Sequence, residues 1–320
     1  MADFLQTLIT SLSVGSLYAL IALGYTMVYG ILKFINFAHS DVVVLGAWIS
    51  YKLASKALPM AGIDPNAAPW WAGGAVLVIA MITCGLVGFT IERLAYKPLR
   101  RAPRLNVLIT AIGVSLLLQN VGQLNYVFGT QPASMPALLP NPDVVDAVIS
   151  TTPDGGQERL VIGLVEVTIF LTAGAIMLGL EFLVYRTKLG TAMRAVSFNT
   201  EIAALMGINV DRVVSFTFVL GSMLAAAAGF LYAMKYPGLN QPAHYTWVLM
   251  GLKAFVAAVL GGIGNIRGAV LGGFLIAFIE QFGAFYVSAE LRDVYVFALL
   301  IIVLLLRPAG LLGRATAEKV

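Results

Sequence analysis

The amino-acid sequence predicts an all-α integral membrane protein: a polytopic bundle of about eight or nine transmembrane helices, some of them broken or re-entrant. Of the 320 residues, 59% are hydrophobic and only 11% are charged, whereas soluble domains carry roughly a quarter charged residues. The mean hydropathy is +0.89. Apolar runs of membrane-spanning length recur along the chain, so we expect residues 1–320 to form a single transmembrane domain.

The first half of the chain supplies five expected spans. Residues 4–32 contain no Asp, Glu, Lys or Arg and form the first. The second, 42–51, follows the polar residues Asn36 to Asp41, so it is expected to be broken near its start. Residues 52–71 contain three prolines and the Trp70-Trp71 pair, and are expected to form a loop. The remaining spans are expected at 72–91, 105–128 and 161–185.

Basic residues indicate the orientation. Residues 92–104 contain Arg93, Lys97, Arg100, Arg101 and Arg104 against one acid, and residues 186–212 contain Arg186, Lys188, Arg194 and Arg212. Positively charged loops are retained in the cytoplasm, so both segments are expected there. The loop 129–160 is rich in Pro and Asp, including Asp154, and is expected to be external. The N-terminus is then outside and the C-terminus, with Arg307, Arg314 and Lys319, is cytoplasmic.

The second half contains one clear span and a region in which the number of membrane crossings is harder to determine. Residues 213–234 carry Gly221, Ala225 and Gly229 four apart, a spacing that lets another helix approach closely. The region 247–307 must cross an odd number of times, and its apolar lengths favour three crossings. A helix broken within the bilayer at Gly261–Gly268, or a re-entrant pair, fits equally well. Pro308 ends the last helix. The three expected spans are 247–262, 268–287 and 294–306.

A short helix is expected within residues 186–212. Asn199 is a suitable N-cap, Glu201 lies in the first turn, and Gly207 stands where a terminating glycine is expected. Ile202, Leu205 and Met206 fall on one face. A helix of about two turns is too short to span a membrane and marginal alone in water. It is either a capped connector on the membrane surface or a docking element for another protein.

Sequence motifs of catalysis and nucleotide binding are absent. His39 and His244 are the only histidines, so there is no zinc-protease His pair, and no Gly-x-Ser-x-Gly elbow or phosphate-binding P-loop occurs. His39-Ser40-Asp41 has the residue types of a catalytic triad without its convergent geometry. The single Cys84 excludes a disulfide within the chain. We therefore expect no enzyme activity, metal or bound cofactor, and any ATP-driven motion must come from another subunit. The basic residues cluster beside apolar spans and form no continuous patch, so we expect no nucleic-acid partner.

Three ionisable residues in the last third are costly inside a bilayer and are functional candidates. Arg267 is expected at a cytoplasmic helix end as an anchor, whereas Lys253 and Glu280 lie further inside their spans. They form either a structural ion pair or a substrate contact. Gly264, Gly268 and Gly272 recur at intervals of four, which predicts close helix packing or a broken backbone that lines a pathway.

Several segments together resemble a known family, the LivH-type permease subunits of bacterial branched-chain amino-acid ABC importers. The resemblance is carried by Asn36 to Asp41 with the following Leu45-Gly46-Ala47, by the segment from Ala192 to Ile208, by Gly261 to Gly273, by Glu280, and by the ending Arg307 to Gly313. It extends from about Gly15 to Gly313. One departure is Ser40-Asp41, where the family usually has Gly-Glu, and this leaves the substrate within the family open.

The resemblance implies that the short helix is a coupling helix that binds an ATPase. The residues expected to couple are Arg194, Ala195, Asn199, Glu201, Ala203, Ala204, Gly207 and Ile208. The broken helices are then expected to line the translocation pathway, with candidates Asn36, His39, Ser40, Asp41, Gly261, Gly262, Gly264, Asn265 and Glu280.

The resemblance also implies partners. These are a second homologous permease subunit in a heterodimer, two ABC ATPase subunits that carry ATP and Mg²⁺, and an external substrate-binding protein, all at the bacterial cytoplasmic membrane. The implied substrate is a branched-chain or other hydrophobic amino acid. The alternatives are an ABC permease for urea, short-chain amides or another small solute, an ion-coupled secondary transporter, and a structural or receptor-like membrane scaffold.

Overall fold

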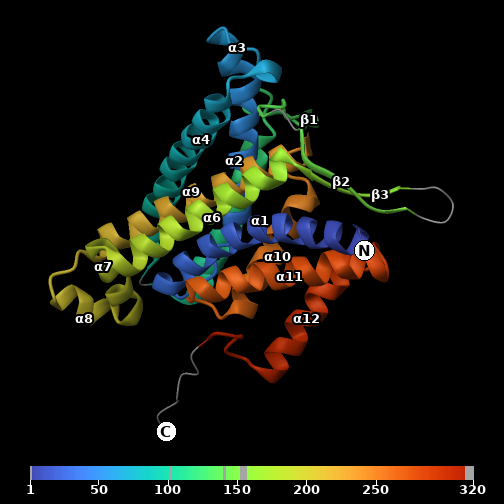
Figure 1. Ribbon diagram of the computed structural model, residues 1–320. Coiled ribbons are helices and arrows are strands. Elements are labelled where there is room, and N and C mark those ends of the chain that lie inside the picture. Colours follow the sequence, from blue (N-terminus) through green and yellow to red (C-terminus); the bar gives the residue numbers. More distant parts are fainter. Residues whose placement is uncertain (1, 101, 140–141, 152–156, 314–320) are drawn as a thin grey trace.

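The computed structural model describes residues 2–100, 102–139, 142–151 and 157–313, which are mostly helical (Figure 1). Six helices in this part are long and apolar enough to span a membrane: α1 (Ala2–Leu32), α4 (Trp70–Ile91), α5 (Arg104–Gly122), α6 (Leu164–Arg186), α9 (Val210–Lys235) and α11 (Ile266–Tyr286). Three shorter helices are α2 (His39–Lys52), α10 (Tyr245–Gly261) and α12 (Arg292–Leu306). The predicted helical membrane bundle is confirmed, and each expected span overlaps one of these helices.

Helices α1 and α9 form the centre of the bundle. Most of their residues are buried, and α1 packs against α9, α10 and α11, while α9 also packs against α2 and α4. Helices α5 and α6 lie at the periphery and leave large apolar side chains exposed, among them Leu116, Leu171 and Phe182. Such an outer surface suits lipid, because hydrocarbon imposes no cost on exposed apolar side chains.

Small residues set the distance between the central helices. A Cβ atom added to Gly46 on α2 would lie 2.5 Å from the Cα atom of Ala226 on α9, and one added to Gly229 would collide with the carbonyl oxygen of Val43. Gly221 faces Gly24 and Val28 of α1 in ordinary contact. The predicted small-residue face of α9 is therefore confirmed as a helix-packing surface.

The predicted break before the second span is present. Helix α1 ends at Leu32, and Lys33 adopts a φ of 57°. Helix α2 begins at His39, whose Nε2 lies 3.2 Å from the carbonyl oxygen of Ile21 in the interior of α1. Residues 33–38 therefore fold back along α1, so α2 starts beside the middle of its neighbour.

Two segments expected to be loops are partly helical. A π-helix (Leu53–Ala57) and the short α3 (Leu58–Met60) extend α2 as far as Met60. The prolines of 52–71 do not prevent this, since Pro59 lies one residue before the end of α3 and the fixed φ of proline, about −65°, is compatible with a helix. A 3₁₀ turn (Pro65–Ala67) then precedes α4.

The basic segment after α4 is also helical at its start. A π-helix (Glu92–Tyr96) and a 3₁₀ helix (Lys97–Leu99) continue α4. Glu92 is fully buried and accepts hydrogen bonds from Arg100 and from Ser215 of α9, the latter at 2.6 Å. This buried carboxylate fixes the segment against α9, so the expectation of a loop across 92–104 is wrong as far as Leu99.

The segment 129–160 contains strands that were not predicted. β2 (Asp143–Thr151) and β3 (Gln157–Gly163) form an antiparallel hairpin that projects from the bundle, and β1 (Ala133–Ser134) pairs with β4 (Gly238–Leu239) (Figure 1). Asp143–Thr151 contains the β-branched residues Val144, Val145, Val148 and Ile149, but the Pro and Asp content around them indicated a loop. Of the residues used to predict the orientation, Arg101, Asp154, Arg314 and Lys319 lie outside the described residues.

The bundle has two distinct ends. At the α8 end, Ser197 donates a hydrogen bond to the carbonyl oxygen of Gly30 at 2.7 Å, and Lys97 pairs with Asp211 at 2.6 Å. At the opposite, hairpin end, Lys235 pairs with Glu166 at 3.2 Å. The described parts of both basic segments, 92–104 and 186–212, therefore lie at the same end, as the predicted crossing parity requires.

Candidate functional site

The segment after α6 forms two helices, α7 (Lys188–Phe198) and α8 (Thr200–Leu205), of which only α8 was predicted. The Asn199 side-chain oxygen accepts hydrogen bonds from the backbone N–H groups of Glu201 and Ile202, both at 2.9 Å. Gly207 has a φ of 83°, and the next N–H, of Ile208, donates to the carbonyl of Ala203 at 3.1 Å. The predicted N-cap and terminating glycine are confirmed.

Large apolar side chains on this segment point away from the bundle. Phe198, Ile202, Leu205 and Met206 are between 54% and 92% exposed, and we refer to these four as the coupling patch. Exposed apolar groups gathered on one short element mark an interaction surface. Phe198 was not among the predicted site residues. Its signal was a bulky aromatic residue directly before the capping asparagine.

The predicted coupling residues divide by exposure. Ala203 is buried against the bundle, and Ala195 and Ile208 are half-buried. The others are exposed beside the coupling patch: Arg194, Asn199, Glu201, Ala204 and Gly207. The exposed set and the patch therefore form one surface, while the buried set attaches α8 to its neighbours.

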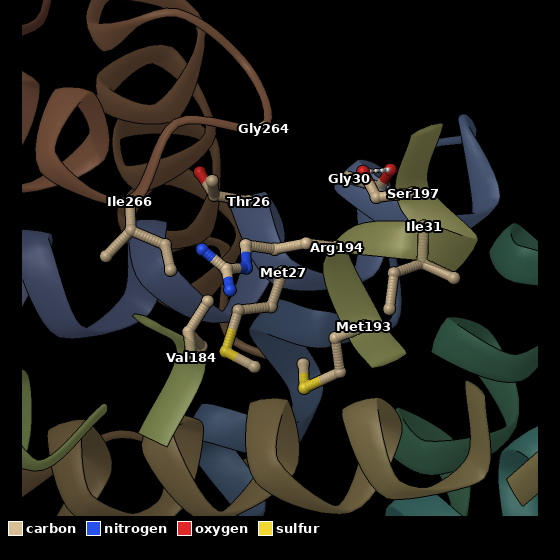
Figure 2. Close-up of a pocket in the computed structure, with 10 residues that line it drawn as sticks. All are labelled: Thr26, Met27, Gly30, Ile31, Val184, Met193, Arg194, Ser197, Gly264 and Ile266. Atoms are coloured by element: carbon tan, nitrogen blue, oxygen red, sulfur yellow. Dashed lines mark hydrogen bonds between the residues drawn. The ribbon is translucent and has the colours of Figure 1, made fainter. Parts of the chain in front are cut away.

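Helix α7 lies between this surface and the bundle interior, and Figure 2 shows its residues Arg194 and Ser197 beside α1. Ser197 bonds the end of α1, and Arg194 lies with its guanidinium carbon 5.5 Å from the centre of the Tyr185 ring. A cavity of about 60 Å³ is lined by α1, α6 and α7 and by the turn between α10 and α11, including Gly264. One predicted coupling residue and one predicted pathway residue thus border the same small cavity.

A second connection runs through the start of α9. Asp211, in its first turn, pairs with Lys97 and with Arg100, each at 2.6 Å. Arg100 in turn pairs with the buried Glu92. Helix α8 is therefore linked to α1 through α7 and to the extension of α4 through the start of α9. In the sequence these charges indicated only an orientation, because each of Lys97 and Arg100 is far from Asp211 along the chain.

The turn between α10 and α11 is closed by the C-terminal segment. Gly262 and Gly264 have φ angles of 101° and 92°, and the Asn265 side-chain oxygen accepts from the N–H groups of Arg267 and Gly268. The N–H groups of Leu311 and Leu312 donate to the carbonyls of Leu260 and Gly261, at 2.8 and 3.1 Å. The orphan carbonyls at the end of α10 are thereby satisfied, as burial requires.

The small residues here pack helices closely, as predicted. A Cβ atom on Gly261 would collide with the carbonyl of Gly268, and one on Gly272 with the carbonyl of Ala257.

Arg267, expected to be an anchor, is exposed at the α8 end and pairs with Glu181 at 2.6 Å.

The polar residues at the start of α2 are all buried. Asn36 accepts a hydrogen bond from the Tyr96 hydroxyl at 2.6 Å, and Asp41 accepts one from Gln119 at 2.9 Å. His39 packs edge-on against the Tyr25 ring, and Ser40 lies against Gly251 of α10. Unlike Asn265, Asn36 does not cap the helix that follows it.

Lys253 and Glu280 belong to a larger group that we call the charge network. Lys253 Nζ lies 2.9 Å from Glu280 Oε1 and 2.6 Å from Asp293 Oδ1. The Tyr18 hydroxyl donates to Glu280 Oε2 at 2.9 Å, and Arg292 lies 3.8 Å from Glu280. The expected ion pair is present. Arg292 and Asp293 were missed because the last span was expected to begin at residue 294.

The charge network borders a cavity of about 340 Å³. Its walls come from α1, α9, α10, α11 and α12. The predicted pathway residues therefore lie in three places: the start of α2, the α10–α11 turn, and this cavity, which contains Glu280 alone among them. Their assignment to a pathway stays a prediction.

Comparisons with known proteins identify the family. A family model described as "Branched-chain amino acid transport system / permease component" matches residues 7–304. The chain is 42% identical to the high-affinity branched-chain amino acid transport system permease protein BraD of Pseudomonas aeruginosa, over 99% of this chain and 98% of BraD. It is 41% identical to LivH of Escherichia coli K12, over 99% and 98% of the two chains.

A more distant relative also covers most of the chain. The probable branched-chain amino acid transport permease protein LivH of Methanocaldococcus jannaschii is 28% identical over 93% of this chain and 89% of its own length. No solved structure matches the chain. The α-helical bundle and the similarity over almost the whole length confirm the resemblance seen in the sequence. This multi-pass membrane protein belongs to the family of permease components of branched-chain amino acid transport systems.

Proposed function

We propose that the chain is the translocating subunit of an ABC importer that carries branched-chain or other hydrophobic amino acids across a bacterial cytoplasmic membrane. The family and the names of the relatives at 41–42% identity support this substrate class. The single observation that carries the mechanism is the coupling patch, because four exposed apolar side chains on a capped two-helix projection require a partner surface.

The partner at this surface is an ABC ATPase. The chain has no P-loop, so ATP and Mg²⁺ are bound by the ATPase subunits, and this chain carries no catalytic residue, metal or cofactor of its own. Arg194, Asn199, Glu201, Ala204 and Gly207 surround the patch and belong to the docking surface. Ala195, Ala203 and Ile208 hold α8 against the bundle.

The α8 end then faces the cytoplasm. The N-terminus is outside and the C-terminus is inside, an orientation supported by the basic residues at the α8 end. The hairpin end, with β2 and β3, faces an external substrate-binding protein. A second homologous permease subunit completes the pathway as a heterodimer.

Coupling requires that ATPase closure favour one of two arrangements of the bundle, since only differential contacts shift such an equilibrium. Helix α8 acts through Ser197 on the end of α1 and through Asp211 on the extension of α4. Both connections end beside broken helices. The proposed pathway groups are those at the breaks and in the cavity: Asn36, His39, Ser40, Asp41, Gly261, Gly262, Gly264, Asn265 and Glu280.

The test is leucine uptake by the purified complex in proteoliposomes. We expect uptake that depends on ATP and on the binding protein, and that is lost in Ala204→Arg, which places a long cation on the docking surface. The matched control Ala204→Ser keeps a small side chain and keeps uptake. Uptake by this chain alone on an ion gradient would show a secondary transporter. Uptake of urea or acetamide but not of leucine would overturn the substrate class. The absence of any uptake would favour a structural or receptor-like membrane scaffold.

A further inference from the structure

The cavity at the charge network is a chemically mixed site inside the bundle. Its volume of about 340 Å³ falls at the lower end of the range for small-molecule sites, about 300–1,000 Å³. Tyr18, Tyr232 and Tyr236 line it together with aliphatic groups that include Leu17 and Leu249. Polar, aromatic and aliphatic surfaces therefore meet around one space.

The charges in the cavity are balanced in sign and graded in depth. Lys253 and Arg292 are cationic, and Glu280 and Asp293 are anionic. The Lys253 and Glu280 side chains are 8% and 3% exposed, whereas those of Asp293 and Arg292 are 46% and 45% exposed. The buried pair thus forms the inner end of the site. The exposed pair, in the first turn of α12, lies toward its mouth.

Two of these groups can exchange partners. Arg292 lies 3.8 Å from Glu280, which is beyond hydrogen-bond range, so its guanidinium N–H groups can turn toward an incoming carboxylate. Asp293 pairs with Lys253 at 2.6 Å from an exposed position on a different helix. A carboxylate that replaces Asp293 on Lys253 would free Asp293 to accept a bond from a ligand ammonium group.

The balance of charge selects the ligand. An unpaired charge inside a bilayer is costly, and removing one partner of a buried pair leaves the other uncompensated. A ligand with one positive and one negative group enters such a site without leaving any charge unpaired. A purely anionic or cationic ligand does not.

We infer that this cavity is a substrate site of the permease itself, in which Lys253 and Arg292 bind the α-carboxylate of an amino acid and Asp293 and Glu280 bind its α-ammonium group. The aliphatic side chain of the substrate then lies against Leu17, Leu249 and the tyrosine rings. This inference rests on the proposed function, because it assigns the place where the amino acid is held. It also explains why the network includes groups from α1, α10, α11 and α12.

The test is protection of a cysteine at the mouth of the cavity. Tyr245 lines the cavity and is largely exposed, while native Cys84 is buried, so Tyr245→Cys introduces an accessible thiol. The complex is placed in nanodiscs without binding protein and labelled with a charged methanethiosulfonate. Leucine at about ten times its dissociation constant slows labelling about tenfold, because labelling requires the empty cavity. 4-Methylpentanoate, which lacks the ammonium group, and 3-methylbutylamine, which lacks the carboxylate, do not.

The matched control and a second variant make the result specific. Met60→Cys, exposed on α3 outside the cavity, is labelled at the same rate with and without leucine. Adding Glu280→Gln to Tyr245→Cys removes one negative charge, so protection passes from leucine to 4-methylpentanoate. A purely structural network predicts no such exchange of ligands.

The outcomes separate this inference from the proposed function. If the unaltered complex imports leucine but leucine does not protect Tyr245→Cys, the cavity is not a substrate site and the proposed function stands. Equal protection by leucine and by either single-charge analogue would also overturn the inference. If the unaltered complex imports no leucine, the proposed function itself fails.

Discussion

The α8 segment and the charge network both place side chains in surroundings that are energetically unfavourable for them, but the two cases are opposite. The coupling patch exposes apolar groups outside the bundle, whereas the charge network buries ions within it. The caps that define α8 come from adjacent residues such as Asn199 and Gly207. The partners of Glu280 come from α1, α10 and α12. The comparison shows that α8 is complete as local structure and lacks a partner, while the network exists only in the folded bundle.

The largest expected effect falls on the network. Glu280→Ala leaves the Tyr18 hydroxyl without its acceptor and leaves Lys253 paired with the half-exposed Asp293 alone. Removing one member of a buried pair costs about 3–5 kcal/mol of unfolding free energy, and we expect the lower end of that range because Asp293 still pairs with Lys253. Denaturation of the purified chain in detergent measures it. The control Glu290→Ala, at an exposed acid before α12, is expected to have almost no effect. Equal shifts in the two variants would mean that the network does not stabilise the bundle.

The next largest effect is expected on binding of the ATPase, with no effect on folding of the chain. Leu205→Asp places a charge in the coupling patch, and loss of an interface hot spot costs about 2 kcal/mol or more, roughly a thirtyfold weaker complex. Leu205 is 86% exposed, so the unfolding transition should not move. Binding of the ATPase to the detergent-solubilised chain measures it. Leu205→Met, which keeps an apolar group, serves as control, and equal binding by both variants would remove the patch from the interface.

A third variant tests close packing beside the turn of α10 and α11. The Cβ atom of Gly261→Ala meets the carbonyl of Gly268, and such overpacking costs about 1–2 kcal/mol. Gly174→Ala in α6 is the matched control, because nothing lies within 4 Å of the added Cβ. It should stabilise the helix by about 0.5–1 kcal/mol. Thermal denaturation of both variants decides the point: shifts of the same sign would contradict it.

The smallest expected effect is local. Asn199→Ala removes the side-chain acceptor of the Glu201 and Ile202 amides, and loss of an N-cap costs about 1 kcal/mol. Hydrogen exchange of these amides should accelerate while exchange in α9 stays the same. Asn199→Asp retains an acceptor and retains protection. Unchanged exchange in Asn199→Ala would show that α8 is held by tertiary contacts alone.

The same contrast explains what the sequence could predict. Membrane spans and the caps of α8 follow from runs and spacings of neighbouring residues, so Asn199 and Gly207 could be assigned correctly. The extension of α4 to Leu99 depends on Glu92 meeting Ser215, which lies on another helix. No local pattern contains that contact, and the positive charges around Glu92 indicated a loop.

The sequence indicated only two of the four charged residues of the charge network. Lys253 and Glu280 were recognised because ions inside apolar spans are unusual. Asp293 and Arg292 lie at a helix end, where charges are common, so nothing in the sequence distinguished them from solvated groups. Only the packing of α12 against α10 and α11 brings them to the cavity.

The hydrogen bonds from Leu311 and Leu312 to the last carbonyl groups of α10 have a consequence for biosynthesis. While the ribosome is still adding α11 and α12, the carbonyls of Leu260 and Gly261 have no donor from this distant part of the chain. The turn beside Gly30 therefore matures only after synthesis has passed Leu312. A translation product arrested inside α12 would leave the carbonyl groups of Leu260 and Gly261 without these two donors.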